Sequence, residues 1–207
     1  MANTVLEKAI RRQQILDSAI RAIARKGYRC ASVTDIVFEA GVARGTFYIY
    51  FQSKEEVFRA ILDYYLQGIK NLVMSGESYS HSGGDISSRL KYIIGGWLRF
   101  LDDNKDMAKI IIREAPAIDP DYDNKYSEVA SAVKQYWENL LVKLQKEGLV
   151  RKECKVEIVA PAIPLVINQI FADKMLREGR TDLDMMTTEL ADFVVKGLRQ
   201  DEWMRWG

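Results

Sequence analysis

The sequence has few of the residues that build metal sites, disulfide frameworks and nucleophilic catalytic centres. Among its 207 residues are one histidine, His81, and two cysteines, Cys30 and Cys154. The cysteines are far apart and lack the paired spacing of zinc ligands or of a redox motif. A single histidine also gives little material for the Ser/His/Asp arrangements of common hydrolases. We therefore expect no metal, no cofactor and no enzymatic activity.

Proline and long apolar runs are also scarce. The four prolines leave long uninterrupted segments, in which apolar residues recur at i, i+3, i+4 and i+7 rather than at alternate positions. This periodicity predicts an all-α protein. No segment has the eighteen or so continuous apolar residues of a membrane span, and charges from Glu7 onward argue against an apolar leader. We expect a cytoplasmic protein without a membrane partner.

Positive charge is concentrated in the first quarter of the chain. Residues 1–54 carry nine Lys or Arg against four Asp or Glu, a formal charge of +5, whereas the remaining residues carry 21 against 25. A basic segment joined to a mildly acidic one is expected if only the first meets a polyanion such as DNA.

Local signals divide this basic segment into three helices, over residues 6–26, 32–40 and 44–51. Ser32 followed by Asp35 three residues later is a capping-box pattern, which starts the second helix. Gly41 supplies the positive φ that a tight turn between two helices requires. Two short helices joined in this way are typical of a helix-turn-helix.

The remaining residues predict six further helices, the first beginning at Lys54. We therefore divide the chain into an N-terminal domain, residues 1–54, and a C-terminal domain, residues 55–207. The first of these six helices should end near residue 73, because residues 75–84 are polar and rich in glycine. The fifth, near residues 156–178, is apolar and contains Pro161 and Pro164, where we expect a bend that shapes a cavity.

The stretch GVARGTFYIYFQSK, residues 41–54, with the helix of residues 32–40 before it, resembles the TetR family of bacterial transcriptional regulators. The resemblance implies a three-helix helix-turn-helix DNA-binding domain followed by a six-helix ligand-binding and dimerisation bundle. It also implies a homodimer that binds a palindromic operator in double-stranded DNA. Most such proteins repress transcription and are released by a small-molecule effector, here expected to be apolar or aromatic.

Carried over position by position, the resemblance assigns operator contacts to the second and third helices and to the residue after them. Arg44 suits a phosphate or a guanine, and Tyr48 suits a phosphate or a thymine methyl group. Ala43 departs from the family pattern, because a hydroxyl that caps the helix is common there. The DNA-binding residues expected are Ser32, Thr34, Arg44, Gly45, Thr46, Tyr48, Tyr50 and Lys54.

Two further sets of residues are candidates for the C-terminal domain. The ligand-binding residues expected are Trp97, Phe100, Ile111, Tyr136, Trp137, Asn168 and Phe171. Aromatic residues at helical spacing more often form a core than a pocket, so any one of these has a structural alternative. The dimer-interface residues expected, on the last two helices, are Ile163, Ile167, Ile170, Leu190, Phe193 and Val194.

A second class of function fits the same composition: an all-α enzyme or ligand-binding protein whose basic segment is incidental. Binding to operator DNA separates this alternative from a regulator. The sequence does not separate a repressor from an activator, and it does not identify the effector.

Overall fold

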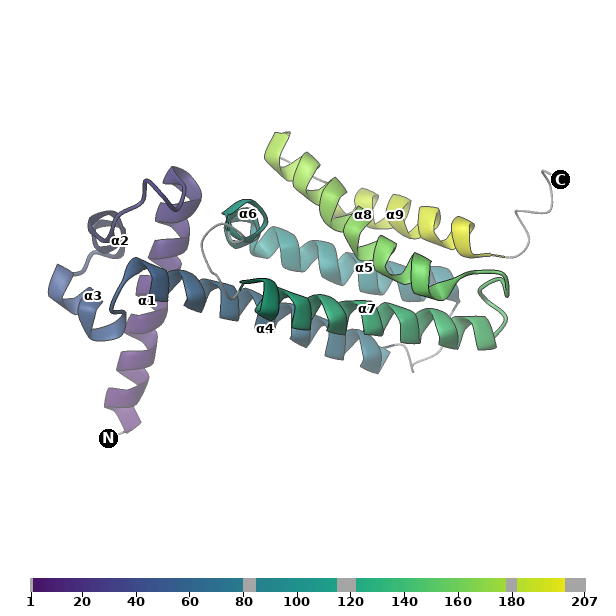
Figure 1. The fold of residues 1–207 in the computed structure, drawn as a ribbon, viewed down its shortest axis with the longest axis horizontal. Helices are drawn as coiled ribbons and strands as arrows, with labels where there is room; N and C mark the ends of the chain where they lie inside the picture. Colours follow the sequence, from purple (N-terminus) through teal and green to yellow (C-terminus); the bar gives the residue numbers. More distant parts are fainter. Residues whose placement is uncertain (1, 80–84, 115–121, 178–181, 200–207) are drawn as a thin grey trace. The chain divides into compact units, whose positions relative to one another are not determined.

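The computed structural model describes residues 2–79, 85–114, 122–177 and 182–199. All regular structure in these ranges is α-helical, which confirms the all-α prediction (Figure 1). The helices are α1 (Ala2–Lys26), α2 (Val33–Ala40), α3 (Arg44–Tyr50), α4 (Lys54–Tyr79), α5 (Ile86–Asp103), α6 (Lys105–Glu114), α7 (Tyr122–Lys146), α8 (Val156–Arg177) and α9 (Leu183–Leu198).

Two helix boundaries differ from the sequence prediction, whereas α8 keeps the range predicted for it. α1 begins at Ala2 rather than near residue 6, and α4 continues to Tyr79 although polar residues follow position 74. α8 remains helical through both Pro161 and Pro164. Each proline lacks only its own N–H donor, so the carbonyls four residues back lose a bond while the rest of the helix is kept.

The chain forms two compact units. The first contains residues 1–67 and 104–126, and the second contains residues 68–103 and 127–207. α4 therefore begins in the first unit and ends in the second. α6 belongs to the first unit, where the Lys109 ammonium donates to the carbonyl of Ala24 at the end of α1. The functional division at residue 54 stays a prediction, because compactness reports packing rather than function.

The first unit is built around α1. The apolar stripe of α1 is buried, and α1 packs against α2 and α6. The core of this unit includes Ile15, Leu16, Ala19, Ile23, Ile36, Phe47, Phe51, Val57, Phe58 and Ile61. Burying each large apolar side chain contributes about 1.5–3 kcal/mol. The core therefore holds the short helices α2 and α3, which would not be stable alone in water.

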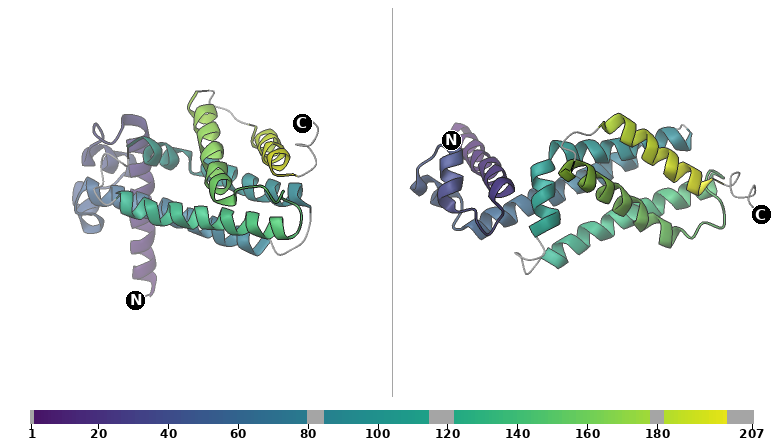
Figure 2. Two further views of the ribbon diagram at one scale, coloured as in Figure 1. Left: turned by 45° about the vertical axis from the view of Figure 1, so that its right-hand side comes forward. Right: turned by 90° about the horizontal axis from the view of Figure 1, so that it is seen from above.

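The second unit is a helical bundle in which α5 packs against both α8 and α9. In the view from above, Figure 2 shows α9 crossing α5, against which it packs. Trp137 of α7 is completely buried, and the Arg89 guanidinium of α5 pairs with Glu147 just after α7, with 2.8 Å between nitrogen and oxygen. These contacts fix α5 and α7 against each other.

Candidate functional site

The turn between α2 and α3 has the local geometry that the sequence predicts. The Ser32 hydroxyl accepts a hydrogen bond from the Asp35 N–H, and the Asp35 carboxylate accepts one from the Ser32 N–H, which completes the capping box. Gly41 has φ 63°, the left-handed conformation that ends α2. Its N–H donates to the carbonyl of Phe38, and Val42 follows with a bond to Val37. The chain thus turns directly into α3.

α3 presents one face to the core and another to solvent. Phe47 is fully buried, whereas Tyr48 is 46% and Ile49 72% exposed. Arg44 and Gly45 are exposed at the start of the helix, and nothing lies within 4 Å of the position that a Gly45 side chain would take. This outer face has the length of two helical turns and suits the major groove of DNA, which admits one α-helix.

The other expected DNA contacts vary in accessibility. Thr34 is exposed, and Thr46 and Tyr50 are half-buried. The Ser32 hydroxyl already serves as the cap of α2, and Ala43 at the start of α3 makes no side-chain cap, as its sequence implies. The Arg44 guanidinium lies 3.4 Å from the Tyr48 hydroxyl, to which it donates, so these two side chains share one face of α3.

Lys54 is placed differently from a solvent-facing phosphate ligand. Its ammonium donates to the carbonyl oxygens of Tyr28, at 2.6 Å, and Ala31, at 2.8 Å. The same nitrogen lies 4.2 Å from the centre of the Tyr28 ring. No local sequence signal predicts this arrangement, because the partners lie 23 and 26 residues away.

Ion pairs join α1 to α2 on the flank of the first unit. Glu39 pairs with both Arg21 and Arg25, and Lys26 contacts Asp35 with 2.6 Å between nitrogen and oxygen. The hydrogen bond from Lys26, followed by those from Ser32, holds the pKa of the Asp35 carboxyl well below its usual range. The bonds from Arg21 and Arg25 lower the pKa of Glu39. Part of the basic charge of α1 therefore supports the fold of the helix-turn-helix.

The second unit contains a cavity of about 230 Å³ between α4, α5 and α7. It is lined by Leu72, Val73, Ser75, Tyr92, Ile93, Gly96, Trp97, Arg99 and Tyr136. Its walls are mainly apolar, with the tyrosines, Ser75 and Arg99 as polar groups. The indole N–H of Trp97, a wall residue only 4% exposed, donates to the side-chain oxygen of Asn168 at 2.8 Å.

Two of the seven residues expected to bind ligand, Trp97 and Tyr136, line this cavity. Asn168 orients Trp97 from behind, and Phe100 packs on Gly68. Trp137 and Phe171 are buried in the second unit, and Ile111 is buried on α6 in the first unit. Arg99 and the wall that α4 contributes were not among the residues expected to bind ligand. A signal for the latter was the i, i+7 spacing of Tyr92 and Arg99 beside the apolar stripe of α5.

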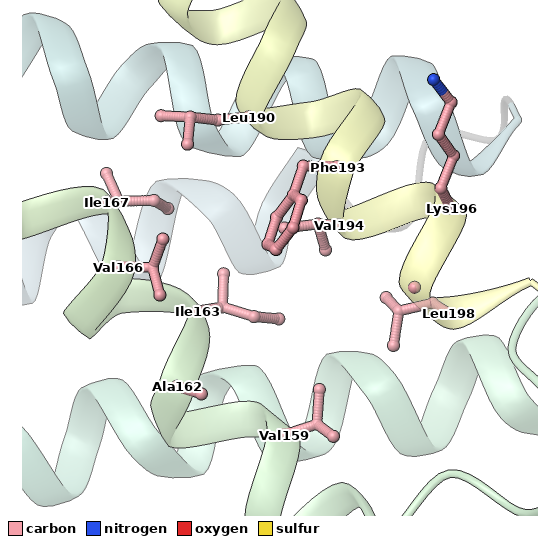
Figure 3. A pocket seen from close by; sticks show the side chains of 11 residues that line it. Val159, Ala162, Ile163, Val166, Ile167, Leu190, Phe193, Val194, Lys196 and Leu198 are labelled. Atoms are coloured by element: carbon pink, nitrogen blue, oxygen red, sulfur yellow. The ribbon is translucent and has the colours of Figure 1, made fainter. Parts of the chain in front are cut away.

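A larger apolar groove, of about 560 Å³, lies between α8 and α9 (Figure 3). Five of the six residues expected at a dimer interface line it, namely Ile163, Ile167, Leu190, Phe193 and Val194. The sixth, Ile170, is half-buried elsewhere on α8. Figure 3 shows Phe193 and Val194 directed from α9 toward Ile163 of α8. Phe193 is 67% exposed, which is costly for a phenyl ring unless another surface covers it.

α8 also bears on the expectation that no segment could span a membrane. Within the described residues, Val156–Lys174 is long and apolar enough to do so by length and composition, and 33% of this window is buried. The window is not continuously apolar, because Glu157, Asn168 and Gln169 interrupt it, and the absence of a membrane partner stays a prediction. A helix that packs against partners on several sides passes the same test.

The fold and the exposed α3 define a helix-turn-helix DNA-binding protein with a separate helical ligand-binding unit. Residues 15–61 match the bacterial regulatory proteins of the tetR family, and residues 83–198 match the tetracyclin repressor-like C-terminal domain. The chain belongs to the TetR family, and it is a DNA-binding, ligand-responsive transcriptional regulator rather than an enzyme.

Similar proteins agree with this assignment over nearly the whole chain. The HTH-type transcriptional regulator YdgC of Bacillus subtilis is 27% identical, with 90% of this chain and 92% of that protein covered. The fatty acid degradation regulator FadR of Bacillus halodurans has a similar fold, with a TM-score of 0.76, 24% identity and coverage of 92% and 97%. FadR of Bacillus subtilis, solved in complex with stearoyl-CoA, also has a similar fold, with a TM-score of 0.72 and 20% identity. The match covers 90% of this chain and 99% of that one.

Proposed function

We propose that this regulator represses transcription by binding a palindromic operator as a homodimer in the cytoplasm, and that a small apolar effector releases it. The observation that carries operator binding is the outer face of α3, where Arg44, Gly45 and Tyr48 are exposed at the start of a helix placed by a capped turn. The contacts we propose are Thr34, Arg44, Gly45, Thr46, Tyr48 and Tyr50, with Ser32 acting mainly through its cap.

A homodimer is supported by the α8–α9 groove. A groove with apolar walls on two helices, one of which has apolar residues that are not confined to a single face, is suited to a four-helix interface with a second copy. Two-fold symmetry also suits operator binding, because it brings two recognition helices to the DNA. One short helix reads few base pairs, whereas two placed about 34–36 Å apart read successive turns of the major groove.

The effector site that we propose is the cavity between α4, α5 and α7. Its apolar wall around Trp97 suits an alkyl or aromatic group, and Arg99 suits an anionic one. A similarly folded regulator is known with stearoyl-CoA, so fatty acyl thioesters are the first compounds to test. α4 contributes Leu72 and Val73 to the cavity, and its first turns belong to the first unit. An effector that prefers one arrangement of α4 therefore changes operator affinity.

Operator binding is tested by footprinting the purified protein on the DNA around its own gene, followed by titrations at several salt concentrations. We expect a protected palindrome, with the logarithm of the binding constant falling linearly with the logarithm of salt. Arg44→Ala should weaken binding and, if the Arg44 of each subunit contacts a phosphate, reduce that slope by about 1.8, because the dimer loses two contacts. Lys134→Ala, at an exposed position of α7, is the matched control and should change neither the affinity nor the slope.

A folded protein that protects no DNA at low salt would favour the alternative function, a ligand-binding protein with an incidental basic segment.

Effector binding is tested by thermal shift with acyl thioesters, free fatty acids and aromatic acids, because a ligand that binds only the folded state raises the melting temperature. Compounds that raise it should then release the protected palindrome. Replacing Trp97 by alanine should abolish the release while leaving the footprint. Release that survives this substitution would place the effector elsewhere.

A further inference from the structure

Lys54, the first residue of α4, contacts the loop that precedes α2 rather than projecting into solvent. Its ammonium donates to the carbonyls of Tyr28 and Ala31, which use two of its three N–H donors. The Tyr28 ring lies below the same charge, with 4.2 Å from nitrogen to ring centre. A cation over an aromatic face with two carbonyl acceptors is a well-satisfied arrangement.

The partners of Lys54 are themselves fixed. Tyr28 is 8% exposed, its ring packs edge-on against Phe58 with 5.2 Å between centroids, and its hydroxyl donates to Glu55 at 3.2 Å. Ala31 is buried and directly precedes Ser32, the cap of α2. The loop of residues 28–31 is therefore held against the start of α4 by the side chains of Lys54, Glu55 and Phe58.

We propose that Lys54 is a positioning residue, which ties the start of α2 to the start of α4 and does not neutralise an operator phosphate. This inference rests on the proposed operator binding. The segment between Ala31 and Lys54 contains α2, the turn at Gly41 and α3 in full. Clamping both ends of that segment sets the position of the recognition surface, and a shift of the first turn of α4 is passed to the cap of α2 through the two carbonyls.

Substitutions that separate charge from geometry test this role. Lys54→Arg keeps the charge, but a planar guanidinium cannot donate to both carbonyls and lie over the Tyr28 ring in the way that a compact ammonium does. Lys54→Met keeps the alkyl chain and removes the charge. For a positioning residue, both substitutions should weaken operator binding by about 10- to 100-fold, which is the scale of lost charge-assisted hydrogen bonds. The salt slope should stay at the wild-type value, and binding of Lys54→Arg to unrelated DNA should be unchanged.

Two results would overturn the proposal: a salt slope that falls by about 1.8 in Lys54→Met, as expected for the loss of one phosphate contact from each subunit, or full operator affinity in either variant. Circular dichroism at the titration temperature checks that each variant is folded. If a variant is unfolded, the following measurement on the wild-type protein still tests the proposal. In ¹H–¹⁵N spectra of lysine ammonium groups, the Lys54 signal should be the same with and without operator, and a shift on binding would mean a phosphate contact. If the wild-type protein binds no DNA at all, the proposed function fails rather than this role of Lys54.

Discussion

The ring of Phe100 on α5 lies directly against the backbone of Gly68 on α4. A Cβ atom added at Gly68 would be 2.5 Å from Cε2 and 2.7 Å from Cζ of Phe100, closer than non-bonded carbons approach. Glycine inside a helix costs about 1 kcal/mol relative to alanine, so close packing explains its presence here. Gly68 is also the residue at which α4 passes from the first compact unit to the second.

We predict that Gly68→Ala moves the Phe100 ring and lowers the free energy of unfolding by about 1–2 kcal/mol, because overpacking outweighs the gain in helix propensity. In a Phe100→Ala background the same substitution should be neutral or stabilising. Urea unfolding of the four proteins gives the coupling between the two positions. Additive effects would mean that the ring moves aside at no cost.

The bond between Trp97 and Asn168 should contribute to stability as well as to the shape of the cavity. Asn168→Ala leaves the indole N–H of a buried tryptophan without its acceptor, which costs about 1–3 kcal/mol. Gln169→Ala, at the exposed neighbouring position, should change stability by less than about 0.5 kcal/mol. Urea unfolding monitored by tryptophan fluorescence measures both. Equal effects of the two substitutions would contradict a specific role for Asn168.

We predict that Phe193→Asp yields a monomer, because a carboxylate placed in the α8–α9 groove cannot be buried against a second copy without a large desolvation cost. Analytical ultracentrifugation measures the mass, and operator affinity should fall with the loss of the second recognition helix. Val142→Asp, at an exposed apolar position of α7, is the control and should remain dimeric. A Phe193→Asp protein that is still a dimer would place the interface on another surface.

The Lys26–Asp35 pair predicts acid sensitivity of the helix-turn-helix. The pKa of Asp35 is lower in the folded state than the ordinary value of about 3.9, chiefly because of the hydrogen bond from Lys26. Its stabilisation is therefore complete above about pH 4 and is lost as the pH falls toward the lowered pKa. Asp35→Asn should reduce the loss of stability between about pH 4 and pH 2, measured by urea unfolding. Glu39 responds in the same direction in both proteins, so only the difference between them reports on Asp35.

Short-range signals accounted for the parts of the fold that the sequence predicted well. The cap formed by Ser32 and Asp35, the turn at Gly41 and the buried face of Phe47 all depend on residues within a few positions of one another. The end predicted for α4, near residue 73, was wrong because it rested on local composition alone. Polar residues after position 74 favour a loop locally, yet the structure continues the helix to Tyr79.

The sequence by itself determined the helices, the tight turn and the side of α3 that faces solvent, because periodicity and capping are encoded within one or two helical turns. Tertiary structure alone decided which aromatic residues line the cavity, why Asn168 faces Trp97 and where the charge of Lys54 lies. Those contacts join residues 23 to 71 positions apart. The apolar or charged character of a residue predicts that it will be buried or paired. Only the packing of the helices decides which residue it contacts.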